Sequence, residues 1–141
     1  MKKILVAMDG SDHAFKAMRV AADLARSLNA KLTLAYVCYI PLAYPADFAG
    51  TGVDAFEEEE RRWASKTLKE AERRASEAAV SVDTTVLSGS PAEALADHAA
   101  SQEYDLVVVG SRGRGAVARV LLGSVADRLV HICKRPVLVV R

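Results

Sequence analysis

The chain has 141 residues, the usual length of one domain, so we expect a single domain over residues 1–141. Nineteen Lys and Arg against eighteen Asp and Glu leave a formal net charge of +1, which argues against a nucleic-acid-binding protein because such proteins carry a basic excess. Hydrophobic residues make up 51% of the chain, which argues against disorder, and the two cysteines, with no CxxC motif, indicate a reducing cytosol rather than a disulfide framework.

No segment of the sequence predicts a leader peptide or a membrane span. The apolar run at residues 4–8 ends at Asp9 and is too short for the core of a signal peptide. Nowhere does the chain approach the roughly 18 uninterrupted apolar residues of a transmembrane helix. We therefore expect a soluble, cytoplasmic protein without membrane insertion.

The first half of the chain predicts two strands, each followed by a helix. A continuous apolar run at residues 4–8 indicates a buried parallel strand, and a second run lies at residues 32–38. A second helix is predicted to begin at Asp54, with Glu57 as its capping partner. Each helix has a row of apolar or small side chains at helical spacing: Ala14, Met18, Ala21, Ala22, Ala25 and Leu28 in the first, and Trp63, Thr67, Ala71 and Ala75 in the second.

Two segments between these elements are unusual. Residues 39–53 contain two prolines and two glycines, and at about fifteen residues they exceed an ordinary connection. We expect either a lid over a ligand or a mobile surface loop there. The acidic run at residues 57–60 is predicted to be a solvated first turn of the second helix, stabilised by the helix dipole.

The second half of the chain continues the alternation. Residues 82–87 are more polar and predict an edge strand, whereas residues 106–109 and 137–140 are continuous apolar runs typical of covered strands. Ser90 before Pro91 predicts a helix start, with Glu93 three residues after the cap. Ser124 and Asp127 give a similar signal for a last helix. Strictly alternating strands and helices predict an α/β fold, with a mostly parallel sheet and helices on both faces.

The loops after the first and fourth strands are the expected ligand site, because ligands of open α/β sheets bind outside the carboxyl ends of the strands. The first strand ends in Asp9, which places a carboxylate at that edge. After the fourth strand, Gly110, Gly113 and Gly115 are predicted to adopt positive φ and to bring backbone N–H groups close to an anion.

Three arginines and one further glycine on the same connection favour a phosphate ligand. Arg112 and Arg114 lie between the glycines and Arg119 follows them, and guanidinium groups suit phosphate oxygens. Gly123-Ser124 lies at the predicted start of the last helix, where backbone donors and the dipole also favour an anion. A flexible surface turn followed by an ordinary serine cap is the alternative interpretation.

The sequence does not favour a P-loop, a dinucleotide-binding motif, a histidine metal site or a cysteine nucleophile. No GK[ST] follows the glycines, as a P-loop requires, and no GxGxxG follows the first strand, as a dinucleotide site requires. The three histidines, His13, His98 and His131, fall in separate helices without matching partners, which favours surface or helix-terminal roles over metal binding. Cys38 and Cys133 are expected to be small buried hydrophobic residues rather than nucleophiles.

The whole chain resembles a single-domain universal stress protein. The resemblance rests on residues 3–11 at the start, residues 89–93 in the third connection, and residues 104–113 and 136–140 near the end. The nucleotide motif of that family, G-x2-G-x9-G-[ST], is met by Gly110, Gly113, Gly123 and Ser124. The resemblance implies a Rossmann-like open sheet of five parallel strands in the order 3-2-1-4-5, similar to the adenine nucleotide alpha hydrolases.

The same resemblance implies a binding site for ATP, with Mg²⁺ or Mn²⁺. Asp9 would face the adenosine side, with Ala7 and Met8 beside it, and Val37 would touch adenine. Gly110 and Gly113 would approach the ribose and the phosphates, with Arg112 and Arg114 as further contributors. Gly123, Ser124 and Val125 would bind the β and γ phosphates. Homodimers through the last strand are also implied, here Pro136, Val137, Leu138, Val139 and Val140, an apolar edge that needs cover.

Three functions follow from these observations. The first is an ATP-binding stress-response or regulatory module, whose nucleotide state alters contacts with its own copy or with an unidentified protein partner. The second is a slow adenine-nucleotide hydrolase or transferase using the same crevice, although a lone Asp9 without a defined nucleophile or base does not support efficient catalysis. The third is an interaction protein that retains the glycines without a ligand.

Overall fold

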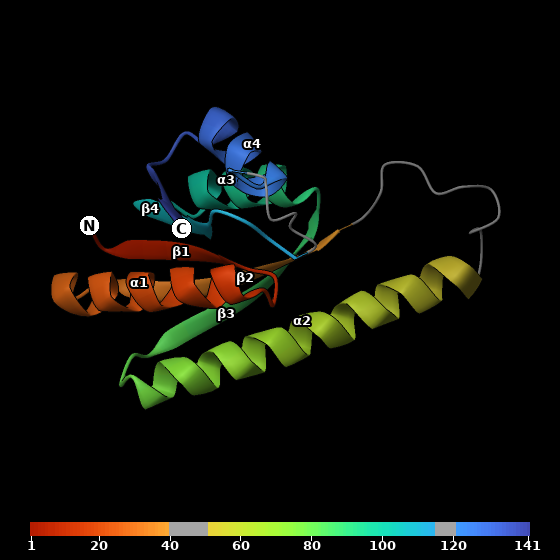
Figure 1. Cartoon of the computed structure of the whole chain (residues 1–141), viewed down its shortest axis with the longest axis horizontal. Helices are drawn as coiled ribbons and strands as arrows, with labels where there is room; N and C mark the ends of the chain where they lie inside the picture. The colour runs from red at the N-terminus through yellow and green to blue at the C-terminus, as the bar shows by residue number, and fades with distance from the viewer. Residues whose placement is uncertain (40–50, 115–120) are drawn as a thin grey trace.

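The computed structural model describes residues 1–39, 51–114 and 121–141 (Figure 1). Strands and helices alternate along these residues, as the sequence predicts. Their bounds are β1 (Lys3–Met8), α1 (Asp12–Leu28), β2 (Lys31–Tyr39), α2 (Thr51–Glu77), β3 (Val82–Gly89), α3 (Pro91–Ser101), β4 (Leu106–Gly110), α4 (Ser124–Ile132) and β5 (Val137–Val140).

The strands form a parallel sheet in the order β3-β2-β1-β4-β5, which confirms the predicted topology. The strand at residues 82–87 is indeed at an edge, as β3, and β5 forms the opposite edge. The order of the strands reverses between β1 and β4, so the crevice at a topological switch point lies at the carboxyl ends of these two strands.

The core has two layers, one on each face of the sheet. β1 supplies both by simple alternation: Ile4, Val6 and Met8 face α1 and α2, whereas Leu5 and Ala7 face α3 and α4. Figure 1 shows the same division, with α1 and α2 on one side of the sheet and α3 and α4 on the other. Because β1 is covered on both faces, it reads as a continuous apolar run.

Small side chains bring α1 close to the sheet. The residues of the predicted apolar row are buried from Ala14 to Ala25, whereas its last member, Leu28, is 47% exposed. Leu28 is the last residue of α1, where Asn29 turns the chain back in a left-handed conformation. At the other end, Ser11 caps the helix by accepting a hydrogen bond from the N–H of Ala14.

The start of α2 differs from the prediction. The helix begins at Thr51, so Asp54 lies inside its first turn and the acidic run at residues 57–60 lies beyond it. The run is also not uniformly solvated: Glu58 is 70% exposed at its side chain, whereas Glu60 is only 14% exposed. Of the predicted lid at residues 39–53, Tyr39 belongs to β2 and residues 51–53 to α2; residues 40–50 lie outside the described residues.

The later helix starts are correct in position but not in detail. Ser90 is the N-cap of α3 and Pro91 its first residue, as predicted, but Glu93 accepts a hydrogen bond from Arg128 over 2.9 Å instead of closing a capping box. The N-cap of α4 is Gly123 rather than Ser124, because the extended backbone at Gly123 makes Ser124 the first helical residue. In the described part of the chain, no helix combines the length and apolar character needed to cross a membrane.

Candidate functional site

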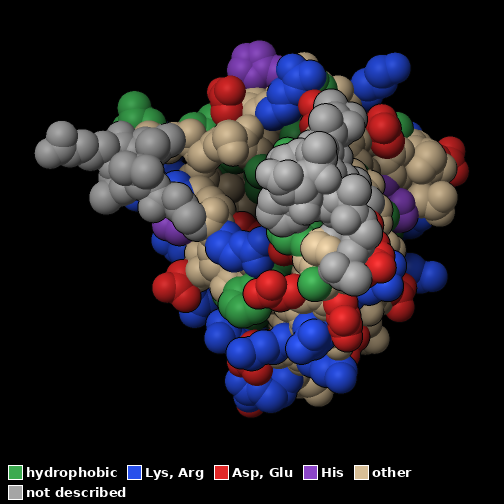
Figure 2. All heavy atoms as spheres, turned by 90° about the vertical axis from the view of Figure 1, so that its right-hand side faces the viewer, with side chains coloured by type: hydrophobic (Ala, Val, Ile, Leu, Met, Phe, Trp, Pro, Cys, Tyr) green, Lys and Arg blue, Asp and Glu red, His purple; other side chains and the backbone are tan. Residues whose placement is uncertain are grey.

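A cavity of about 430 Å³ opens at the carboxyl ends of β1, β2 and β4, beside the starts of α3 and α4. Figure 2 faces this edge of the molecule and shows hydrophobic side chains at the bottom of a hollow bordered by charged ones. The residues that the family resemblance assigns to the nucleotide all line this cavity: Ala7, Met8, Asp9, Val37, Gly110, Arg112, Gly113, Arg114, Gly123, Ser124 and Val125. The volume is within the usual range of small-molecule sites.

Asp9 joins the loops after β1 and β4. Its Oδ1 accepts a hydrogen bond from the N–H of Ser11 over 2.8 Å, and its Oδ2 accepts one from the N–H of Arg114 over 2.9 Å. Its carbonyl oxygen accepts a third from Nε1 of Trp63 on α2 over 3.2 Å. The predicted carboxylate therefore stands at the cavity with a fixed orientation, and it is also a structural link between segments far apart in the sequence.

The motif glycines are explained by close packing of the protein on itself. An added Cβ would lie 2.8 Å from the carbonyl of His13 at Gly110 and 2.8 Å from Oδ2 of Asp9 at Gly113. At Gly123 it would lie 3.2 Å from the carbonyl oxygen of Ser111. The glycines thus let the loop after β4 pack against the start of α1, Asp9 and the start of α4.

The expected positive φ is wrong at Gly110 and Gly113. Among the described glycines, positive φ occurs at Gly10 (86°) and Gly89 (122°). Gly10 needs it because the chain turns sharply between β1 and α1, directly under Trp63 of α2. Gly115 and Arg119 of the predicted anion loop lie outside the described residues.

The start of α4 forms one end of the cavity. Ser124, Val125 and Ala126 of its first turn line the space, and no described side chain caps the helix. The N–H of Gly123 is tied back to the carbonyl of Ser111 over 2.6 Å, which fixes the helix start against the loop after β4. The first-turn N–H groups and the helix dipole make this end suitable for an anion. Arg112, half-buried, adds a guanidinium to the same lining.

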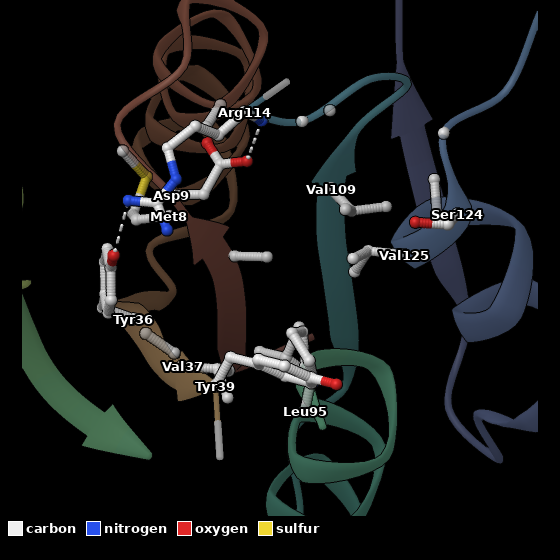
Figure 3. Close-up of a pocket in the computed structure, with 18 of the residues that line it drawn as sticks. Met8, Asp9, Tyr36, Val37, Tyr39, Leu95, Val109, Arg114, Ser124 and Val125 are labelled. Atoms are coloured by element: carbon white, nitrogen blue, oxygen red, sulfur yellow. Dashed lines mark hydrogen bonds between the residues drawn. The ribbon is translucent and has the colours of Figure 1, made fainter. Parts of the chain in front are cut away.

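The side chain of Arg114 is directed elsewhere. Its guanidinium donates to the hydroxyl of Tyr36 and to Oε1 of Glu60, over 3.2 Å each, and lies 5.4 Å from the ring centre of Trp63. In Figure 3 it points to Tyr36, across the cavity from Ser124 and Val125. Burial raises the pKa of Tyr36 to about 12, even with the guanidinium beside it, so its phenol stays protonated at neutral pH.

The other end of the cavity is apolar. Val37 and Tyr39 of β2 lie there together with Leu95 of α3 (Figure 3). Tyr39 is 47% exposed and Leu95 is buried. The sequence reasoning missed Tyr36, Tyr39, Glu60 and Leu95. Tyr39 could have been found, because it lies two residues after Val37 and strand side chains two apart share a face.

The predicted roles of histidine and cysteine fit the structure in part. Cys38 is buried as expected, whereas Cys133 is half-buried, and both are free thiols. Nδ1 of His13, at the start of α1, is buried and has no hydrogen-bond partner in the described residues. Across residues 1–39, 51–114 and 121–141, no three His, Cys, Asp or Glu side chains gather closely enough to hold a metal ion.

Comparison with known proteins agrees with this geometry. The model of the Universal stress protein family matches residues 1–141. The chain belongs to the universal stress protein family. Universal stress protein YxiE of Bacillus subtilis (strain 168) is 32% identical over 145 residues, covering 99% of this chain and 98% of YxiE.

Solved universal stress proteins share the fold. Universal stress protein UspA from Lactobacillus plantarum superimposes with a TM-score of 0.88 at 26% identity, covering 99% of this chain and 97% of its own. A universal stress protein described in complex with cAMP superimposes with a TM-score of 0.70 at 30% identity, covering 99% and 96%. The family and its parallel sheet are therefore established for this chain.

Proposed function

We propose that this universal stress protein binds ATP, as its Mg²⁺ or Mn²⁺ complex, in the cavity between β1, β2 and β4 and acts as a regulatory module. The observation that carries the proposal is the lining of one cavity by every residue that the family resemblance assigns to the nucleotide. A similar universal stress protein has been solved with cAMP, which supports an adenine nucleotide as the ligand class.

The phosphates would lie at the start of α4. Uncapped first-turn N–H groups at Ser124 and Val125 face the cavity, and they are donors that suit phosphate oxygens. Arg112 is the described guanidinium in the lining without an ion-pair partner among the described residues, whereas Arg114 is paired with Glu60. We therefore assign charge neutralisation of the phosphates to Arg112.

The adenosine would occupy the opposite, apolar end. Val37 and Leu95 supply apolar contact, and Tyr39 offers an exposed aromatic ring on which a base can stack. Asp9 lies between the two ends, with its carboxylate oriented by two backbone N–H groups. Its remaining acceptor positions suit the hydroxyl groups of a ribose.

A regulatory role is favoured over catalysis because the two carboxylates at the cavity are already held by hydrogen bonds within the protein. Asp9 is engaged by the loop backbone and Glu60 by Arg114, and within the described residues neither carboxylate has a hydrogen bond to a His or Lys side chain. A general base needs to be within hydrogen-bond reach of the proton that it takes, and a nucleophile needs such a base. We therefore expect at most slow turnover of bound ATP.

Two further parts of the proposal concern assembly and location. The free edge of β5 is apolar over Val137–Val140, which favours pairing with a second copy into a homodimer. A change in nucleotide state would then alter this pairing or the contact with a protein partner. The free thiols of Cys38 and Cys133 fit a reducing cytoplasm.

Native mass spectrometry with equal concentrations of ATP, ADP, AMP and cAMP tests the ligand. We expect one ATP per chain to dominate the bound population, with little release of phosphate over time in a parallel assay. Dominant binding of cAMP would contradict ATP as the ligand, and no binding of any of the four would contradict the function. Sustained multiple-turnover phosphate release would support a hydrolase instead.

A further inference from the structure

Glu60 is a half-buried carboxylate that the proposed nucleotide contacts do not use. It lies on α2 with 14% of its side chain exposed. Its Oε1 accepts a hydrogen bond from Arg114 over 3.2 Å, and its Oε2 is buried without a partner among the described residues. Removing a carboxylate from water is costly, so its position here needs a compensating role.

The partner of Glu60 is the residue that holds the loop after β4 in place. The guanidinium of Arg114 contacts Glu60 on α2 and Tyr36 on β2, while its backbone N–H donates to Asp9 at the end of β1. One residue thus ties residues 111–114, the anchor loop, to three other elements. Because the anchor loop also packs against Gly123, its position determines the shape of the phosphate end of the cavity.

We propose that Glu60 is a positioning residue, which orders the anchor loop and Asp9 for the nucleotide by holding the Arg114 guanidinium against β2. The proposal rests on the proposed function. In it, Arg114 serves the site as an anchor and not as a ligand of the phosphates. The carboxylate of Glu60 acts through Arg114 and touches no part of the ligand.

Simple electrostatics and the positioning role predict opposite changes in ATP affinity when the charge of Glu60 is removed. Glu60 lines the cavity that is to receive a polyanion, so simple Coulomb repulsion would make its removal tighten ATP binding. Release of the Arg114 charge toward the phosphates would act in the same direction. If Glu60 orders the anchor loop, its replacement by the isosteric, neutral Gln instead weakens binding, because the charge-assisted hydrogen bond that links the loop to α2 becomes a weaker neutral one.

Calorimetric titration of ATP with magnesium into the full-length Glu60→Gln variant shows whether ATP binding becomes weaker or tighter. Glu58→Gln is the matched control, because it removes the same charge from the same helix at an exposed pair with Arg62 (3.5 Å). We expect Glu60→Gln to raise the Kd about tenfold, because the hydrogen bond from Arg114 loses its charge assistance, and Glu58→Gln to change it less than twofold. Unchanged or tighter binding by a folded Glu60→Gln chain overturns the proposal.

A measurement without ligand keeps this test separate from the proposed function. Amide hydrogen exchange should be faster across the anchor loop in Glu60→Gln than in wild type, and unchanged in Glu58→Gln. The fluorescence of Trp63, the single tryptophan of the chain, should also shift, since Arg114 lies over its ring. Unchanged exchange in Glu60→Gln overturns the positioning role. Faster exchange without ATP binding by the wild type would leave that loop-ordering role intact and reject the proposed function.

Discussion

The backbone N–H of Arg114 donates to Oδ2 of Asp9 over 2.9 Å, and this one hydrogen bond joins the end of β1 to the loop after β4. The two residues are 105 positions apart in the sequence. Gly113 lies beside them, so close to Asp9 that a Cβ would displace the carboxylate. The spacing of the motif glycines therefore has a structural cause within the protein, because these glycines let the loop after β4 pack closely where it lines the cavity.

Gly113→Ala tests whether this contact matters for binding. The new Cβ would lie 2.8 Å from Oδ2 of Asp9, so the hydrogen bond to Arg114 must break or shift. We expect ATP to bind roughly tenfold more weakly in calorimetry, about the worth of one hydrogen bond. Gly52→Ala, at an exposed site in the first turn of α2, is the control and should bind like wild type. Wild-type affinity in Gly113→Ala would contradict the role given to the contact.

The sequence predicts the strands well because each is an apolar run in a sheet covered on both faces. The residues that the family resemblance assigns to the nucleotide line one cavity, since parallel strands end at one edge of the sheet. Glu60 could not be predicted, because its burial depends on where α2 lies against β2 and Arg114. In the sequence it is one of four consecutive glutamates. The need for glycine at position 113 could not be predicted either, because a Cβ there would contact Oδ2 of Asp9, which is far away in the sequence.

Arg112→Ala should weaken ATP binding but leave adenosine binding unchanged. The guanidinium lines the phosphate end, and adenosine carries no phosphate for it to neutralise. We expect a five- to tenfold rise in the Kd for ATP, about 1–1.4 kcal/mol, and a weaker dependence of that Kd on salt. Parallel calorimetric titrations with both ligands measure the difference. An equal loss for adenosine would show that Arg112 acts on the fold or on the base end.

Asp105→Asn should destabilise the protein near neutral pH and lose this effect in acid. The carboxylate accepts hydrogen bonds from the N–H groups of Lys2 (2.7 Å) and Lys3 (2.9 Å) at the start of β1, and these bonds lower its pKa below the usual 3.8. A depressed folded pKa contributes stability above the unfolded pKa, which disappears as pH falls through the folded value. Urea unfolding at pH 7 and pH 3 measures the difference in unfolding free energy between the variant and wild type. The same gap between variant and wild type at both pH values would contradict the assignment.

Val139→Pro tests pairing at the β5 edge. The carbonyls of Pro136 and Val140 accept hydrogen bonds from β4, so by alternation the backbone of Val139 points to the free edge. Proline there keeps the bonds to β4 and removes one outward donor from each copy. We expect the dissociation constant of the homodimer to rise about tenfold or more in sedimentation velocity. The wild-type chain serves as the reference, and an unchanged dimer in a folded Val139→Pro variant would rule out this edge as the interface.

Binding of ATP in this cavity, through Asp9, the anchor loop and the start of α4, is the proposal on which the others depend. Calorimetric titration of ATP with magnesium into the purified wild-type chain tests this binding most directly. We predict one site per chain with a Kd on the order of micromolar, equivalent to about −8 kcal/mol. The absence of both heat and a thermal shift on addition of ATP would contradict the claim.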